Sequence, residues 1–449
     1  MNMYMKNSIS KIKLLAFGFI LAVFSSCSFF EVDETIDPNN PDANEFLENP
    51  TAIELNQLAI GVFGSMRGGF SDYFRITGSL GREIYVFAST ESRWYTELLG
   101  TAGVIDNSNF LNAYFPSFFT TVRRAALFSK SANTSVLLTE NDKKAISGFS
   151  KTIQAFGMLH ALNMQGENGI RVDLEDIFNP GPIVGYDEAL VAIKTLLDEG
   201  YDELTTSTTA FPFTVPSGFS AYATPANFAK YNRALAARVT LYQEDWDEVL
   251  NVLPLSYMNL TGSLTASPLF TYGNAPDVNN PLFQRANTNP STLVAVHPDM
   301  VASIQASGSR SSKILQRTTP RSLGGLTGTH ESALYATNTT SIPLLKNEEL
   351  ILIYAEALAQ TGETTEAIDA INIIRNAYGL VDYAGPEDLS SLIDEILNQR
   401  KVSLFYEGHR WIDMRRYNRL DELPLDLETH IVFDRMPIPF AELQWDQHN

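Results

Sequence analysis

Two stretches of the sequence, residues 229–253 and 349–374, share a pattern that strongly limits the folds open to the chain. Each contains an alanine-rich helix, a short polar turn and a second helix that opens on acidic residues. Small residues such as Ala234 and Ala357 let paired helices approach closely. One such pair cannot bury its own apolar face, so the pairs stack, as tetratricopeptide-like hairpins do. The sequence therefore predicts a mostly α fold built on helical hairpins.

Amphipathic periodicity extends beyond these two pairs. Apolar residues recur at helical spacing, which predicts helices at about residues 141–166, 186–204, 226–253, 347–377 and 389–418. Stretches rich in glycine, serine, threonine and proline separate them, and the longest, at about residues 254–345, is predicted to be a loop-rich insert. Strand signals are short and sparse. We therefore expect residues 49–449 to form a single domain, a scaffold of tetratricopeptide-like hairpins with long inserted loops.

The N-terminal segment is typical of an exported protein. Three lysines precede an apolar run at residues 14–24, and two serines and Cys27 follow it. The run is shorter than the roughly 20 apolar residues that a transmembrane helix needs. Cys27 is the single cysteine of the chain, so no disulfide can form within it.

This pattern is similar to a bacterial lipobox. We predict that residues 1–26 are a lipoprotein signal peptide, that Cys27 is lipidated and that residues 27–48 are an acidic tether. The alternative is ordinary cleavage beside an incidental cysteine, and Phe24 stands where a lipobox usually has leucine. A lipid anchor on Cys27 would hold the protein to a membrane, although stable anchoring usually takes more than one acyl chain.

The overall charge narrows the range of partners. The chain has 52 acidic and 32 basic residues and a formal net charge of −20. Nucleic-acid binding needs clustered lysine and arginine to neutralise phosphates, so no nucleic-acid partner is expected. An acidic surface is compatible with a neutral ligand such as an oligosaccharide, and no cofactor or metal ion is predicted.

A dense group of charged residues lies near the C-terminus. Four of them follow one another at spacings of three: Glu407, Arg410, Asp413 and Arg416. Such spacings favour ion pairs along one helix face. A metal site would need a third ligand beside His409 and Asp413. A general acid–base pair of Glu407 and Asp413 is disfavoured because the nearby arginines would keep both carboxylates ionised. We therefore expect this group to be structural.

The C-terminal part of the chain resembles the signature of the SusD/RagB family. The signature comprises an acidic residue, Tyr-Ala-Glu-Ala, Asn-x-Ile-Arg, Glu-Gly-x-Arg-x-x-Asp-x-x-Arg and Pro-Ile-Pro. These fall on Glu349 and on residues 354–357, 372–375, 407–416 and 437–439. In the fourth motif the matching residues, which such proteins use structurally, are Glu407, Gly408, Arg410, Asp413 and Arg416. The chain departs from the family at Glu244, where a hairpin turn usually has a glycine that tolerates positive φ.

The resemblance implies a non-catalytic lipoprotein at the outer-membrane surface of Bacteroidota-type bacteria. Such a protein covers a SusC-like, TonB-dependent transporter and captures oligosaccharide for import. Peptide or another nutrient, as in the RagB type, is an alternative cargo. A helical glycosidase is a further alternative, but it would need two carboxylates about 5–10 Å apart across a cleft, and no sequence feature nominates such a pair.

The inserted loops are rich in aromatic residues, which we expect to be exposed and available to a ligand. They are Phe211, Phe213, Phe219, Tyr222, Phe270, Tyr272 and Phe283. If these rings are instead buried in the body, a protein- or peptide-binding role becomes more favourable, because tetratricopeptide-like grooves commonly bind polypeptide segments.

Five residues are predicted to contact the ligand: Tyr73, Arg93, Trp94, Tyr95 and Tyr272. Trp94 has polar neighbours rather than the leucines and isoleucines of a helical core. Aromatic rings stack on the C–H faces of sugars, and polar neighbours donate directed hydrogen bonds. We expect Trp94 to be a stacking platform, Arg93 to donate to ring hydroxyls and Tyr73 or Tyr272 to supply a second ring. The alternative is that Trp94 packs its loop onto the body.

Overall fold

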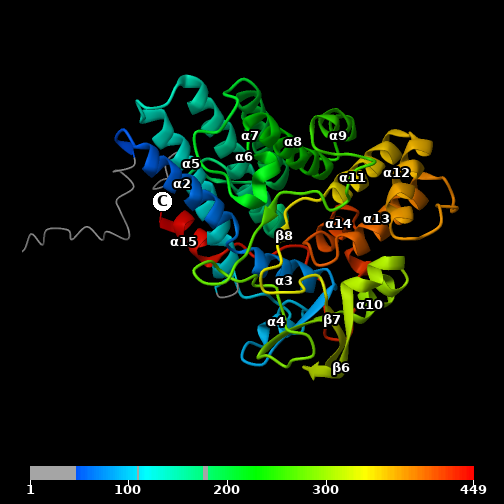
Figure 1. Cartoon of the computed structure of the whole chain (residues 1–449). Helices are drawn as coiled ribbons and strands as arrows, with labels where there is room; N and C mark the ends of the chain where they lie inside the picture. Colours follow the sequence, from blue (N-terminus) through cyan, green and yellow to red (C-terminus); the bar gives the residue numbers. More distant parts are fainter. Residues whose placement is uncertain (1–46, 109–110, 175–179, 449) are drawn as a thin grey trace, which may run out of the picture. The chain divides into compact units, whose positions relative to one another are not determined.

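Most of the described chain is helical, which confirms the predicted fold class (Figure 1). The computed structural model describes residues 47–108, 111–174 and 180–448. Within it, Asn49–Asn449 group into one compact unit. The predicted signal peptide, Cys27 and all but the end of the predicted tether lie outside the described residues. In the ranges that are described, no helix combines the length and the apolar character needed to cross a bilayer.

The helices occupy the following positions. They are α2 (Ala52–Met66), α3 (Phe70–Leu80), α4 (Arg93–Thr96), α5 (Leu111–Thr134), α6 (Glu140–Gln165), α7 (Tyr186–Thr205), α8 (Pro225–Tyr242), α9 (Trp246–Val252), α10 (Pro298–Gln305), α11 (Asn347–Thr361), α12 (Thr364–Ala377), α13 (Leu389–Ser403), α14 (Arg410–Arg416) and α15 (Phe440–His448).

Local sequence explains where the longer helices begin. Thr51 and Glu54 form a capping box at the start of α2, and Thr139 and Asp142 form one at the start of α6. In each box the threonine hydroxyl accepts from a backbone N–H of the first turn, and the acidic side chain accepts from the threonine N–H. These contacts satisfy backbone donors that have no partner inside the helix.

Helices α5, α6, α7 and α8 pack in sequence order, each against the next (Figure 1). Two glycines of α6 permit this close packing. A Cβ on Gly148 would lie 2.7 Å from the carbonyl oxygen of Gly200 in α7, and one on Gly157 would lie 2.9 Å from that of Phe118 in α5. Side chains at these two positions would force the neighbouring helices apart.

The two related helix pairs of the sequence correspond to α8–α9 and α11–α12, and α11 packs against both α8 and α9. A buried ion pair joins the two hairpins. Arg238 of α8 donates to both carboxylate oxygens of Glu349 in α11, at 2.6 and 2.7 Å. Both side chains are almost completely buried, so this pair fixes the position of one hairpin on the other.

The predicted insert at residues 254–345 is more ordered than a set of loops. Its strands β5 (Thr292–Val296), β6 (Ile314–Leu323) and β7 (Leu326–Ser332) join β1 (Ile84–Ala88) in an antiparallel sheet of order β1-β5-β7-β6. The remaining described strands form two short pairs: β2 (Ile170–Arg171) with β3 (Ile183–Val184), and β4 (Leu269–Phe270) with β8 (Ile342–Pro343). The insert therefore supplies most of the sheet.

The expectation that the aromatic residues of the inserts are exposed is wrong. The buried ones are Phe213, Phe219, Tyr222, Phe270 and Tyr272, while Phe211 and Phe283 are half-buried. Their rings fold back onto helices: Phe219 lies 5.1 Å from Phe63 of α2, and Phe270 lies 5.0 Å from Phe70 of α3, measured between ring centroids. Glycine and proline in these stretches mark turns of the backbone, whereas the rings between the turns fill the core.

Candidate functional site

Asp413 lies at the centre of a buried cluster of ionised groups. Arg400 of α13 donates to both of its carboxylate oxygens, at 2.7 and 3.1 Å, and Arg416 donates to one of them at 3.2 Å. Arg416 also donates to Glu356 of α11 at 2.6 Å. Burial opposes ionisation of Asp413, but the two guanidinium groups outweigh it and hold its pKa below the usual value. The cluster joins α11, α13 and α14.

Glu407 and Arg410 do not form the predicted ion pair. The helix predicted at 389–418 is interrupted, because Tyr406 and Gly408 have positive φ, of 60° and 82°. As a result Glu407 lies before α14, whereas Arg410 is its first residue. Glu407 instead accepts from Lys346 at 2.8 Å. A Cβ on Gly408 would lie 2.5 Å from the ring of Tyr73, which explains the glycine at this position.

His409 is a buried neutral histidine beside a salt bridge. Its Nε2 lies 3.6 Å from Glu349, which is already paired with Arg238. Burial and the charge of Arg238 lower the pKa of His409 well below its usual value. Across the described parts of the chain, no group of three or more His, Cys, Asp or Glu side chains could hold a metal ion. Asp413, held between two arginines, is also unsuited to be a general acid.

The predicted residues Arg93, Trp94 and Tyr95 form the short helix α4, which follows β1 and packs against β1 and α3. We call these three residues the α4 surface. All three side chains are half-buried. Glu91 fixes Arg93, because its carboxylate accepts from the guanidinium at 2.8 and 2.5 Å and from the Arg93 backbone N–H at 3.2 Å.

The two rings of the α4 surface rest on different parts of the core. Trp94 packs against the main hydrophobic cluster of the body, and Tyr95 packs against the cluster around β1, β5 and β7. A Cβ on Gly324, in the β6–β7 turn, would lie 2.7 Å from the Tyr95 ring. Both residues are therefore held against the core while remaining only half-buried.

Tyr73 does not belong to the α4 surface, in contrast to the prediction. Its side chain is 2% exposed, and its ring lies edge-on to Phe118 with centroids 5.8 Å apart. Its hydroxyl accepts from the amide of Asn163 at 3.1 Å, and burial raises its pKa to about 12. In α3 the apolar residues recur at helical spacing, and Tyr73 lies within that inward stripe.

Tyr272 is also mostly buried, at 8% exposure. The guanidinium of Arg67 lies 5.8 Å from its ring centroid, and Arg67 pairs with Asp277 at 3.1 Å. Arg67 and Asp277 line a pocket of about 240 Å³ between α2 and the insert. The contacts found for Tyr272 lie there and not at α4, so it cannot supply a second stacking ring as predicted.

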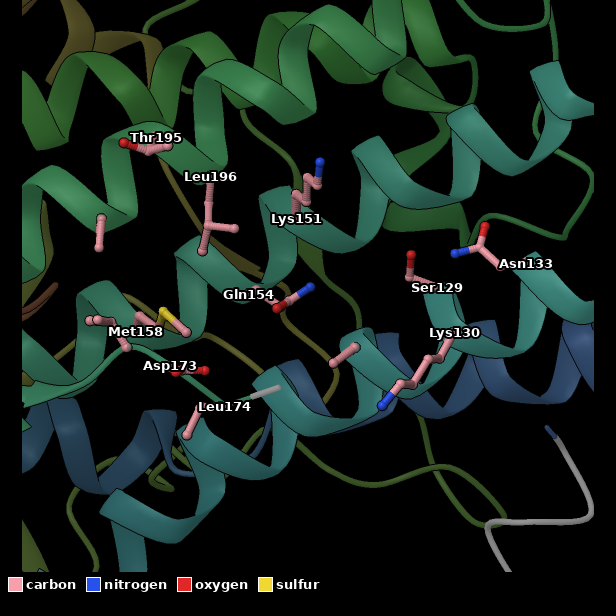
Figure 2. A pocket seen from close by; sticks show the side chains of 13 residues that line it. Ser129, Lys130, Asn133, Lys151, Gln154, Met158, Asp173, Leu174, Thr195 and Leu196 are labelled. Carbon is pink, nitrogen blue, oxygen red and sulfur yellow. The ribbon is translucent and has the colours of Figure 1, made fainter. Parts of the chain in front are cut away.

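Sequence reasoning missed a larger pocket of about 630 Å³. Figure 2 shows Lys151, Gln154 and Met158 of α6 between residues of α5 and residues of α7. We call this pocket the α5 groove. It is lined by Ala126, Ser129, Lys130, Asn133, Lys151, Gln154, Met158, Val172, Asp173, Leu174, Ala192, Thr195 and Leu196. One signal was present: Lys130–Asn133 and Lys151–Gln154 repeat the same cation–amide spacing on successive helices.

Comparison with known proteins gives a consistent result. The sequence model of the SusD family matches residues 301–446. A SusD-like protein of Formosa agariphila is 38% identical over 92 residues, which cover 19% of this chain and 18% of that relative. The matched stretch is thus less than a fifth of the curated relative.

Solved structures share the fold over most of the chain. A SusD superfamily protein of Bacteroides vulgatus has a TM-score of 0.67 at 17% identity and covers 88% of this chain and 97% of its own. A laminarin-binding SusD-like protein has a TM-score of 0.65 at 18% identity, and the match covers 88% of this chain and 98% of that protein. Surface glycan-binding protein A of Bacteroides uniformis has a TM-score of 0.70 at 13% identity, and the match covers 89% of this chain and 99% of that protein.

The C-terminal third thus carries the sequence pattern of the SusD family, on a fold that solved SusD superfamily proteins share over nearly their whole length. The chain is therefore similar to the SusD family in sequence over residues 301–446, and similar to solved SusD superfamily proteins in fold over most of its length.

Proposed function

We propose that the protein binds glycan at the cell surface and captures oligosaccharide for a SusC-like, TonB-dependent outer-membrane transporter. Solved proteins of the same fold support the glycan part, since one is described as laminarin-binding and another as a surface glycan-binding protein. In this proposal residues 1–26 are removed, Cys27 carries the lipid and residues 27–48 are a tether to the outer membrane.

The observation that carries the proposal is the α4 surface. Trp94 and Tyr95 each pack on the body and are half-buried, not enclosed. A ring held in this way loses little freedom when a sugar stacks on it. The Arg93–Glu91 pair sets a donor and an acceptor beside the rings, which suits sugar hydroxyls because each one can donate and accept.

The proposed function is binding without catalysis. The carboxylates in the family motif are committed to structural contacts, because Asp413 lies between two arginines and Glu407 accepts from Lys346. A glycosidase would need a raised pKa on a carboxylic acid that faces the substrate. Hydrolysis of any oligosaccharide that the protein binds would contradict the proposal.

The test begins with a glycan array, including laminarin, and a peptide array, both probed with the purified protein. Calorimetry then compares the best glycan with wild type and Trp94→Ala. We expect a loss of about 1–3 kcal/mol of binding free energy, by analogy with aromatic stacking on nucleic-acid bases. Peptide hits without glycan hits would instead favour a RagB-type cargo.

Trp246→Ala is the matched control. Trp246 is a half-buried tryptophan at the start of α9, so this variant removes the same ring from another surface. It should bind the glycan as wild type does, and both variants must keep a melting temperature that indicates a folded chain. Equal affinity of Trp94→Ala and wild type would exclude the α4 surface as the binding site.

A further inference from the structure

A second pocket, of about 270 Å³, lies between α5 and α15 and adjoins the α5 groove. We call it the α15 pocket. Three aromatic residues line it: Phe115 and Phe119 of α5 and Trp445 of α15. Phe115 and Phe119 stand four residues apart, so they share one face of α5, and their ring centroids are 4.9 Å apart. The described lining of the α5 groove has no aromatic ring, so the two pockets differ in chemistry.

The walls of the α15 pocket are fixed by contacts within the protein. Arg171 of β2 is 5% exposed, and its guanidinium holds α15 by donating to Glu442 at 2.7 Å and to Asp446. The start of α15 is held as well, because the backbone N–H of Phe440 donates to the carbonyl of Asn107 at 3.1 Å. A ligand that enters a pocket with fixed walls pays little to order them.

The ionised groups at this pocket balance one another. Arg123, Arg171 and Glu442 line it, and Asp446 pairs with Arg171. These two cations and two anions leave no net charge that would select an acidic or a basic ligand. They still offer both kinds of hydrogen bond. Arg123 forms no ion pair with a described side chain and can donate, and Arg171 binds only one oxygen of Glu442. A sugar hydroxyl needs such a mixture, because it both donates and accepts.

The size and the walls of the pocket favour a compact ligand over an extended polypeptide. Pockets for drug-sized ligands measure about 300–1,000 Å³, so 270 Å³ suits a smaller unit such as one sugar ring. Three prolines contribute to the lining: Pro116, Pro180 and Pro439. Proline has no backbone N–H, so these walls cannot donate the main-chain hydrogen bonds by which an extended polypeptide is usually held.

We propose that the α15 pocket binds one sugar unit of a neutral glycan. Trp445 stacks on the C–H face of the sugar, over an apolar floor formed by Phe115 and Phe119. Arg123 donates to one hydroxyl of the sugar, and Glu442 accepts from another. The α15 pocket and the α4 surface have no described lining residue in common, so the proposal stands whether or not the α4 surface binds glycan.

The test starts from the purified Trp94→Ala protein, in which the α4 surface is disabled. An array of neutral and acidic glycans is probed with this protein, and the best neutral glycan is measured by calorimetry. Adding Trp445→Ala removes the stacking ring, so the dissociation constant should rise about tenfold or more. Affinity should stay within about twofold between 50 mM and 500 mM salt, because a neutral ligand has no ion pair for salt to screen.

Two further variants separate binding from folding. Ala441 is an exposed lining residue of α15, so Ala441→Leu narrows the pocket without removing a buried contact, and it should weaken binding about fivefold. Leu443→Ala is the matched control, since Leu443 is 37% exposed on the same helix and does not line the pocket. It should bind as its parent does.

Three outcomes would overturn the proposal. The first is that Trp94→Ala protein binds no neutral glycan of the array, which leaves the α4 surface as the sugar site. The second is that Trp445→Ala and Ala441→Leu leave the affinity unchanged. The third is capture of a polyproline decapeptide on the same array without any neutral glycan, because aromatic-lined hollows also take proline-rich segments. Glycan binding that survives Trp94→Ala and is lost in Trp445→Ala would confirm the α15 pocket.

Discussion

Glu244 occupies a backbone conformation that normally belongs to glycine. It has φ of 57° in the turn between α8 and α9, whereas Gly362, in the related turn between α11 and α12, has φ of 89°. The left-handed region costs a residue with a Cβ about 1–2 kcal/mol. The departure from the family turn pattern at Glu244 is therefore a local strain that the hairpin tolerates.

Glu244→Gly should stabilise the protein slightly. Glycine removes the strain of the left-handed conformation, which is about 1–2 kcal/mol. Its greater freedom in the unfolded chain costs about 0.5–1 kcal/mol, which is less. We expect a rise of about 0.5–1 kcal/mol in the free energy of unfolding, measured by urea denaturation. Gly362→Ala, the opposite change in the related turn, should lower it. A less stable Glu244→Gly variant would show that the Glu244 side chain stabilises the turn by other contacts.

Glu83 makes stability depend on pH in a direction unusual for a carboxylate. It is 1% exposed, one oxygen accepts from the Tyr406 N–H at 2.9 Å, and the other has no partner in the described chain. Burial raises its pKa to about 8, from an ordinary value of 4.5. Between these values the folded state holds a proton that the unfolded state releases, so the contribution of Glu83 to stability falls as pH rises.

Glu83→Gln should remove this dependence, because the amide stays neutral at every pH. Urea denaturation at pH 5.5 and pH 8.5 should show wild type losing more stability than the variant, by up to about 1.4 kcal/mol per pH unit. The difference between the two proteins isolates Glu83 from other titrating groups. Parallel curves for the two proteins over this range would show that Glu83 is ionised when folded.

The contacts of α14 make it a structural element rather than a site. Asp413→Ala would leave Arg400 and Arg416 buried with one carboxylate fewer, at a cost of about 3–5 kcal/mol in the free energy of unfolding. Ligand binding by the folded fraction should not change, because the Asp413 side chain is buried. Asp394→Ala in α13, which breaks an exposed pair with Arg419, should cost less than about 1 kcal/mol. Normal stability with lost ligand binding in Asp413→Ala would assign α14 a functional role.

The sequence was most informative for amphipathic helices, whose apolar residues repeat every three or four positions. The structure places α6 at Glu140–Gln165 and α7 at Tyr186–Thr205, against predictions of 141–166 and 186–204. Helix α5 went unpredicted because Pro116 and polar residues interrupt its apolar pattern. The sheet was also missed, since β1 and β5 are short, mostly apolar runs that periodicity alone cannot distinguish from buried helix.

The candidate site was only partly predictable, for a related reason. Arg93, Trp94 and Tyr95 are neighbours in sequence, so any local fold keeps them together. Tyr73 and Tyr272 had to meet them through tertiary packing, which no local pattern specifies, and both are instead buried elsewhere. The α5 groove has the same limitation, because its lining comes from three helices and from the segment that ends at Leu174.

Within the compact unit Asn49–Asn449, the α4 surface and the α5 groove rest on different supports. The α4 surface lies on β1 and α3, whereas the α5 groove lies on successive helices of the scaffold. Neither surface contributes lining residues to the other, so each can be altered by substitution without touching its counterpart.

The proposed lipid anchor of the whole molecule depends on a single atom, the sulfur of Cys27. Cys27 is the only thiol of the sequence, so it is the one side chain to which the proposed lipid could be attached through sulfur. Cys27→Ala should therefore abolish labelling by a fatty-acid probe and release the protein from the outer-membrane fraction, while Ser28→Ala should change neither. Glycan binding by the released protein should equal that of wild type, because Cys27 precedes the compact unit. Continued labelling, or retention in the membrane fraction after a high-salt wash, would exclude Cys27 as the anchor.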